Sequence, residues 1–129
     1  MKKNRLTIHI KRPIQDVFQF TTTPPNSIKW IPGVIKEETT EWPVRMGTVY
    51  KLTDNSGKIS NVTVSALLDN EYIEWISEDH NYHCKYTFRP TTPNTTELEY
   101  AEWVDGGDID GPFTLETLQK LKTILEKKS

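Results

Sequence analysis

The sequence is poor in several features, and each shortage excludes a class of protein. It contains a single cysteine, Cys84, which rules out an intramolecular disulfide and a cysteine-based zinc site. Charge of neither sign dominates, since 16 basic residues stand against 18 acidic ones and the formal net charge is −2. Basic residues cluster only near the two chain ends, so we expect no nucleic-acid-binding surface.

Long hydrophobic runs are also missing. The chain has no stretch of about 18 apolar residues, the length that indicates a membrane-spanning helix. No apolar segment follows Met1, so the first residues do not have the pattern of a secretory signal. From these two observations we expect a cytoplasmic protein without a membrane span.

What the chain does contain is typical of one folded domain over residues 1–129. Its hydrophobic share is 35%, and its aromatic residues comprise 4 Trp, 5 Tyr and 4 Phe. A chain of this length can bury a hydrophobic core without the help of a metal or a disulfide. Aromatic side chains can fill such a core or line a cavity inside it.

The first part of the sequence predicts a strand followed by two short helices. Apolar residues alternate with polar ones over residues 5–11, which predicts a strand with one buried face. Pro13 suits the first position of a helix, and Pro24-Pro25 ends that helix. One further helical turn carries Trp30 to a Pro-Gly stop.

The middle of the sequence predicts six strands. They are expected near 34–41, 46–53, 58–68, 71–78, 81–89 and 96–104. Turn signals such as Asp54-Asn-Ser-Gly57 separate them, and short turns join antiparallel neighbours. The alternation is clearest in the fifth of these strands, where Tyr82, Cys84, Tyr86 and Phe88 predict one apolar face.

The last part predicts a loop over Asp105–Gly111 and a helix from Pro112 to about Lys127. Two short helices cannot cover the inner face of a long curved sheet, so the last helix must lie in its concavity. The expected fold class is therefore α+β: a curved seven-stranded antiparallel sheet wrapped around a long C-terminal helix. Space remains between the sheet and this helix for a ligand.

Four segments, taken in order, carry a resemblance to a known superfamily. They are Ile8-His-Ile10 with Lys11-Arg-Pro13 and Asp16-Val-Phe18; Trp30-Ile-Pro-Gly33; Met46-Gly-Thr48; and Leu118, Leu121, Lys122 and Leu125-Glu126. They are similar to the first strand and helix, the turn into the second strand, the start of the third strand and the last helix of START-related (SRPBCC) helix-grip proteins. This superfamily includes Bet v 1-like, polyketide cyclase-like and lipid-transfer proteins.

The resemblance covers nearly the whole chain. It implies a hydrophobic cavity, open at one end, that binds lipids, sterols, polyketides or other apolar small molecules. It does not imply catalysis, because most such domains carry or sense a ligand, and a fold does not fix a function.

We expect ten side chains to contact the ligand, although each could instead only fill the core. They are Trp30, Tyr50, Leu52, Trp75, Tyr86, Phe88, Leu98, Tyr100, Leu118 and Leu121. Several bring a hydroxyl or indole N–H group that needs a partner when buried, and a few polar groups in an apolar cavity orient a ligand. For Trp30 we expect an anchoring role in its turn rather than a place at the cavity mouth.

Glu102 leaves two alternatives open. In a regular strand it points inward, and as a buried carboxyl with a raised pKa it could act as a general acid or base. A strand end or a bulge next to Ala101 and Trp103 would instead turn it to water. The second alternative is the one that we expect.

The remaining polar residues predict no metal or cofactor site. His9 and His83 fall on outward faces and His80 falls in a turn, while Cys84 is interpreted as a small buried hydrophobic residue. The Asp105–Gly111 loop echoes part of an EF-hand but lacks two of its main ligands. We expect this loop to be acidic and flexible, with Asp110 near the N-terminus of the last helix, and its glycines could let that helix swing as a lid.

Three functions remain at this stage. The first is binding or transport of a hydrophobic small molecule, such as a lipid, a polyketide or an aromatic metabolite. The second is a cyclase- or dehydratase-type enzyme that uses Tyr50, Tyr86, Tyr100 or Glu102, although no convincing acid–base pair supports it. The third is a protein-interaction module, for example a homodimer, that uses the sheet edge or an exposed Trp42 and Trp103.

Overall fold

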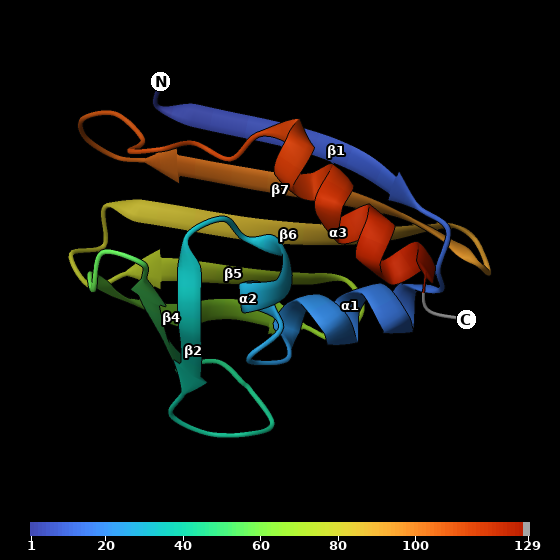
Figure 1. Ribbon diagram of the computed structural model, residues 1–129, viewed down its shortest axis with the longest axis horizontal. Helices are drawn as coiled ribbons and strands as arrows, with labels where there is room; N and C mark the ends of the chain where they lie inside the picture. The colour runs from blue at the N-terminus through green and yellow to red at the C-terminus, as the bar shows by residue number, and fades with distance from the viewer. Residues whose placement is uncertain (128–129) are drawn as a thin grey trace.

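A computed structural model describes residues 1–127 of the chain (Figure 1). The strands are β1 (Lys3–Ile10), β2 (Val34–Thr39), β3 (Val49–Asp54), β4 (Ile59–Leu68), β5 (Tyr72–Ser77), β6 (Tyr82–Thr92) and β7 (Thr95–Val104). The helices are α1 (Ile14–Thr22), α2 (Ser27–Trp30) and α3 (Leu115–Lys127). This order matches the one that the sequence predicts.

All seven strands form one antiparallel sheet in the order β1-β7-β6-β5-β4-β3-β2. The meander from β2 to β7 is therefore continuous, and β1 joins it beside β7. Figure 1 shows all three helices on one face of this sheet, with α3 running along β1 and β7 and with α1 and α2 beside it. The arrangement confirms the predicted α+β helix-grip fold. Among residues 1–127 no helix is long and apolar enough to cross a membrane.

The core lies between the sheet and the helices. In β1, Ile8 and Ile10 face inward and are 8% and 0% exposed, as the alternation predicts. From α3, Leu118, Leu121 and Leu125 are buried, which follows from their spacing along one helix face. Each such side chain contributes about 1.5–3 kcal/mol by leaving water.

Two polar contacts fix α3 against the end of β1. The Lys122 ammonium donates to the carbonyl of His9 at 2.6 Å and to the Glu126 carboxylate at 2.6 Å. The same carboxylate accepts the backbone N–H of Lys11 at 2.8 Å. These bonds set the position of the helix over the sheet.

The segment before α3 differs from the prediction. The helix begins at Leu115, not at Pro112, so Asp110 does not lie in its first turn. The backbone N–H of Phe113 donates to Glu102 at 2.8 Å, which holds this segment against the sheet. The preceding loop is also held, because Ile109 is buried and its N–H donates to the carbonyl of Met1 at 2.8 Å.

Candidate functional site

A pocket of about 120 Å³ lies between the inner face of the sheet and the segments that cover it. Its wall consists of residues from α1, α2 and the residue after it, six strands and the segment before α3. The lining residues are Thr21, Ser27, Ile31, Glu37, Tyr50, Leu52, Val62, Trp75, Tyr82, Cys84, Tyr86, Tyr100 and Phe113. Six of these thirteen are aromatic, so the wall consists largely of rings.

Half of the predicted contact residues line this pocket. Tyr50, Leu52, Trp75, Tyr86 and Tyr100 are part of its wall. The other five, Trp30, Phe88, Leu98, Leu118 and Leu121, are buried in the core but are not among its lining residues. Alternation along the strands identifies the inner face, but it does not show where on that face the packing leaves a space.

The rings of the wall meet mostly edge to face. Trp75 packs against Tyr50 with centroids 5.5 Å apart at 88° and against Tyr86 with centroids 4.9 Å apart at 70°. Phe113 stacks on Tyr100 at 4.1 Å and 9°. Contacts of this kind stabilise a wall beyond the burial of its area, so the pocket has a firm aromatic lining.

Trp30 has the position expected of an anchor. It is completely buried, and its ring contacts Tyr86 at 6.2 Å and Phe113 at 6.0 Å from behind the wall. Within residues 1–127 the indole N–H groups of Trp30 and Trp75 are buried without a hydrogen-bond partner. Both indoles contact neighbouring rings, whose faces can accept an N–H group weakly.

Glu37 is the charged residue among the lining residues that the sequence interpretation missed. Its side chain lines the pocket and the residue is only 8% exposed. Its two carboxyl oxygens accept the Ser27 hydroxyl at 2.7 Å and the Ser27 N–H at 3.2 Å. Burial raises the pKa of this carboxyl, although the two bonds from Ser27 oppose the shift.

A signal for Glu37 exists in the sequence. Glu37 and Glu38 are neighbours in a strand, so one of the two must point to the inner face. The structure has a register shift between Val34 and Lys36, which leaves Ile35 exposed and turns Glu37 inward. This irregularity hides the alternation that would have indicated Glu37.

The tyrosine and cysteine groups of the wall are held in their neutral forms. Burial is the main cause that raises the pKa of Tyr50, whose hydroxyl donates to the carbonyl of Thr22 at 2.6 Å. Burial also raises the pKa of the Cys84 thiol to about 12. At neutral pH Cys84 is therefore a thiol rather than a nucleophilic thiolate, which agrees with its interpretation as a small hydrophobic residue.

Glu102 corrects the expectation that a bulge turns it to water. The pairing of β7 with β1 and β6 is regular through this position, and Glu102 is 2% exposed. Its carboxyl oxygens accept the Tyr82 hydroxyl at 2.7 Å, the Asn4 amide at 2.8 Å and the Phe113 N–H at 2.8 Å. Glu102 thus lies beside the pocket and fixes Tyr82 and Phe113 in its wall.

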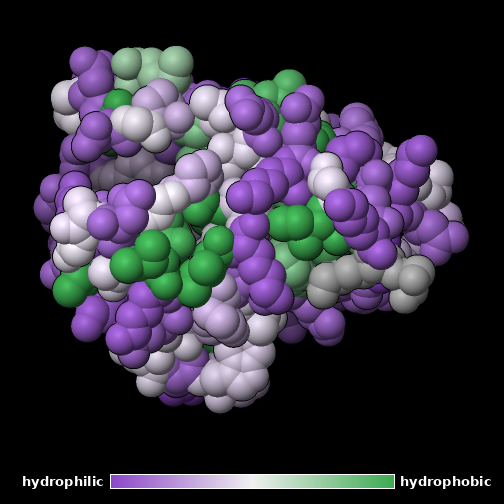
Figure 2. All heavy atoms as spheres, in the orientation of Figure 1, coloured by the Kyte–Doolittle hydropathy of each residue, from purple (hydrophilic) through white to green (hydrophobic). Residues whose placement is uncertain are grey.

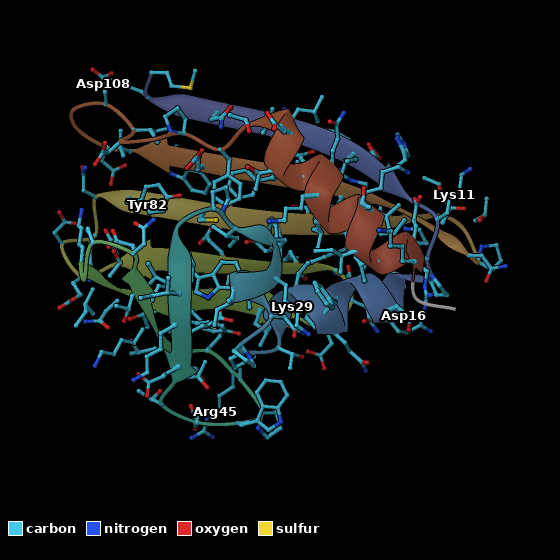
Figure 3. The ribbon with its side chains drawn as sticks, in the orientation of Figure 1. Lys11, Asp16, Lys29, Arg45, Tyr82 and Asp108 are labelled. Carbon is cyan, nitrogen blue, oxygen red and sulfur yellow. The ribbon has the colours of Figure 1, made fainter. Side chains whose placement is uncertain are left out.

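An open groove at one end of the sheet adjoins the pocket. Leu52, Val62 and Tyr82 line both spaces, so the groove and the pocket share part of their wall. Figure 2 shows the molecule hollowed at its left end, below the loop that connects β7 to α3. Figure 3 places Tyr82 and Asp108 at this same end.

The histidines and the acidic loop form no metal site within the described part of the chain. His9 is exposed, His80 lies in a turn, and His83 stacks on Trp103 at 4.9 Å with its Nε2 3.0 Å from Asp105. In the loop, Asp108 contacts the N-terminal ammonium of Met1 at 3.1 Å instead of converging with other carboxylates.

Comparison with known proteins identifies the family. Residues 1–127 match the family described as polyketide cyclase / dehydrase and lipid transport. No curated protein sequence matches significantly.

Solved structures share the fold at low sequence identity. An uncharacterised protein from Bacillus thuringiensis has a TM-score of 0.74 at 15% identity, with 95% of this chain and 98% of that chain covered. A START superfamily protein from Mycobacterium smegmatis has a TM-score of 0.70 at 17% identity, covering 99% and 97%. The Aha1 dimer from Colwellia psychrerythraea has a TM-score of 0.61 at 16% identity, covering 98% and 91%. With its sheet, its C-terminal helix and the family match over residues 1–127, the chain belongs to the polyketide cyclase / dehydrase and lipid transport family, and it shares its fold with a START superfamily protein.

Proposed function

We propose that this protein binds a small, mostly hydrophobic molecule in the aromatic pocket. The observation that carries the proposal is the pocket itself, with six rings in its wall and few polar groups. Small-molecule sites have this composition, in which apolar walls supply affinity and a few polar groups supply orientation. The residues proposed to contact the ligand are the five predicted ones in the wall together with Glu37, Tyr82, Cys84 and Phe113.

The volume of the pocket limits the ligand. Pockets for drug-sized ligands measure about 300–1,000 Å³, whereas a cavity of about 150 Å³ accommodates a benzene molecule. At about 120 Å³ the pocket fits a ligand with roughly the bulk of one ring. A long acyl chain would require the wall to open.

Ligand binding can be tested on the purified protein and two variants. Native mass spectrometry before and after denaturing extraction should reveal a small co-purifying compound, and single-ring compounds should raise the melting temperature. Val62→Trp fills the pocket and should abolish this shift. Thr63→Trp is the matched control, because the next residue of β4 points to the other face. Binding that survives in Val62→Trp, or no binding in the wild type, would contradict the proposal.

A catalytic role of the cyclase or dehydratase type is a second candidate, favoured by Glu37. A carboxyl with a raised pKa beside a pocket can donate and accept protons. Glu102 suits this role less well, because Tyr82, Asn4 and Phe113 already occupy its oxygens. If Glu37→Gln retains the ligand but loses turnover of an identified substrate, the catalytic role is supported; unchanged turnover would exclude Glu37.

A self-association surface is a third candidate. Trp42 and Met46 in the connection between β2 and β3 are 59% and 63% exposed, and one similar structure is a dimer. Exposed tryptophan and methionine are enriched at protein interfaces. Analytical ultracentrifugation of the wild type and of Trp42→Ala measures this directly, and a wild-type monomer at high concentration would exclude it.

A further inference from the structure

Glu37 and Glu102 are both buried carboxyl groups, but they differ in the hydrogen-bond donors that surround them. Glu102 receives donors from three residues on three different segments. Within residues 1–127, Glu37 receives donors from Ser27 alone, and both of these donors are neutral groups. Buried carboxylates are normally paired with a positive charge or fully hydrogen-bonded. Glu37 therefore has acceptor capacity left, and it borders the pocket.

The rest of the wall carries no positive charge. The hydroxyls of Ser27, Tyr50 and Tyr82 donate to protein acceptors, whereas the Trp75 N–H has no hydrogen-bond partner within residues 1–127 and its ring contacts neighbouring rings. Of the residues lining the pocket in the described chain, none is a lysine, arginine or histidine. The faces of aromatic rings attract cations, most strongly when water is excluded. A positively charged ligand would contact these rings and the Glu37 carboxylate, and no positively charged side chain of the wall would repel it.

The groove that adjoins the pocket is also acidic. Its lining includes Glu78, Asp79, Asp108 and Asp110, and among the described residues that line it Lys58 is the one basic side chain. The Met1 ammonium offsets Asp108, and acidic side chains still outnumber the positive groups. A cleft lined by charge of one sign concentrates ions of the opposite sign. The adjoining groove therefore favours the same class of ligand as the pocket wall.

We propose that the pocket takes a small organic cation with a methylated ammonium group, which the aromatic rings surround and for which Glu37 is the counter-ion. This inference rests on the proposed binding function and specifies the class of its ligand. The volume of the pocket suits such a ligand, because a methylated ammonium group has about the bulk of a single small ring, which is the size that the pocket admits.

The test compares two ligands of equal shape. One is choline, and the other is the uncharged alcohol in which a carbon atom replaces the nitrogen of choline. Isothermal titration of the full-length protein at low ionic strength should show choline binding at least about 10-fold tighter. The comparison uses the wild-type protein, so it does not depend on the folding of a variant.

Two variants assign the preference to Glu37. Glu37→Gln should weaken choline binding about 10- to 100-fold while changing binding of the uncharged alcohol by less than about 3-fold. Glu38→Gln is the matched control, since it removes the same charge from an exposed neighbour on β2 and should leave both affinities unchanged.

The outcomes separate this inference from the proposed function. If the uncharged alcohol binds as tightly as choline, the inference is overturned while binding of a small apolar molecule stands. If both variants weaken choline binding equally, Glu37 is not the counter-ion and the inference also fails. If neither compound binds, the inference falls, and the single-ring compounds tested above decide the proposed function separately.

Discussion

Removing the Glu102 carboxyl should destabilise the protein more than removing a half-buried carboxyl from the outer face of the same strand. In Glu102→Ala the N–H of Phe113 would lose its acceptor. The Asn4 amide would still donate to the Phe113 carbonyl at 2.9 Å, and the Tyr82 hydroxyl would still have the Tyr100 hydroxyl as a hydrogen-bond partner at 3.3 Å. An orphaned buried N–H costs about 1–3 kcal/mol, and each weakened bond costs about 0.5–1 kcal/mol. We therefore expect a loss of about 3 kcal/mol in the free energy of unfolding.

Glu102→Gln and Glu97→Ala complete this comparison. A glutamine retains one acceptor oxygen, so a loss of only about 1 kcal/mol is expected. Glu97 lies on the other face of β7, 3.9 Å from Arg89, and its removal should cost less than about 1 kcal/mol. Urea unfolding followed by tryptophan fluorescence measures all three values. If Glu102→Ala costs no more than Glu97→Ala, Glu102 does not fix Phe113 to the sheet.

Two further predictions concern α3 and the pocket carboxyl. Leu121→Ala should cost about 2–5 kcal/mol because Leu121 is fully buried, whereas Leu115→Ala, at a site 44% exposed, should cost less than about 1 kcal/mol by the same unfolding assay. Equal losses would contradict the assignment of the inner face of α3. Burial raises the pKa of Glu37 above 4.5, so between pH 4.5 and the raised pKa the folded protein holds a proton on Glu37 that the unfolded chain has released. This contribution to stability is lost as pH rises through the raised pKa, above which Glu37 is a carboxylate. The melting temperature of Glu37→Gln minus that of the wild type should therefore increase as pH rises from about 4 to about 8. A difference that stays constant over this pH range would refute the prediction.

The elements and their order could be predicted from the sequence because local patterns determine them. Alternation placed Tyr82, Cys84, Tyr86 and Phe88 on one face of β6, and all four point to the inner side of the sheet in the structure. The prolines predicted where α1 and α2 end. Such patterns act over a few residues, so a single sequence reveals them.

The pocket could be predicted only in part, because it depends on contacts between distant segments. Glu37 is turned inward by an irregularity in β2, and Phe113 enters the wall because Glu102 binds its backbone. For the same reason the sequence predicts that α3 begins at Pro112 rather than at Leu115, because no local pattern reveals that residues 112–114 are held by a strand. The space itself is what remains after these segments pack.

The pairing of β1 with β7 has a consequence for the order in which the chain can fold. Residues 3–10 are synthesised before the other strands, but their partners are residues 96–103, so the pairing closes a loop of more than 80 residues. Until β7 has been made, β1 has neither its neighbouring strand nor α3, and its apolar side chains remain in water. Such non-local pairing slows folding, because loop closure must precede the contacts that stabilise it. We therefore expect the last folding step to require a nearly complete chain, with the N-terminal strand among the last elements to dock.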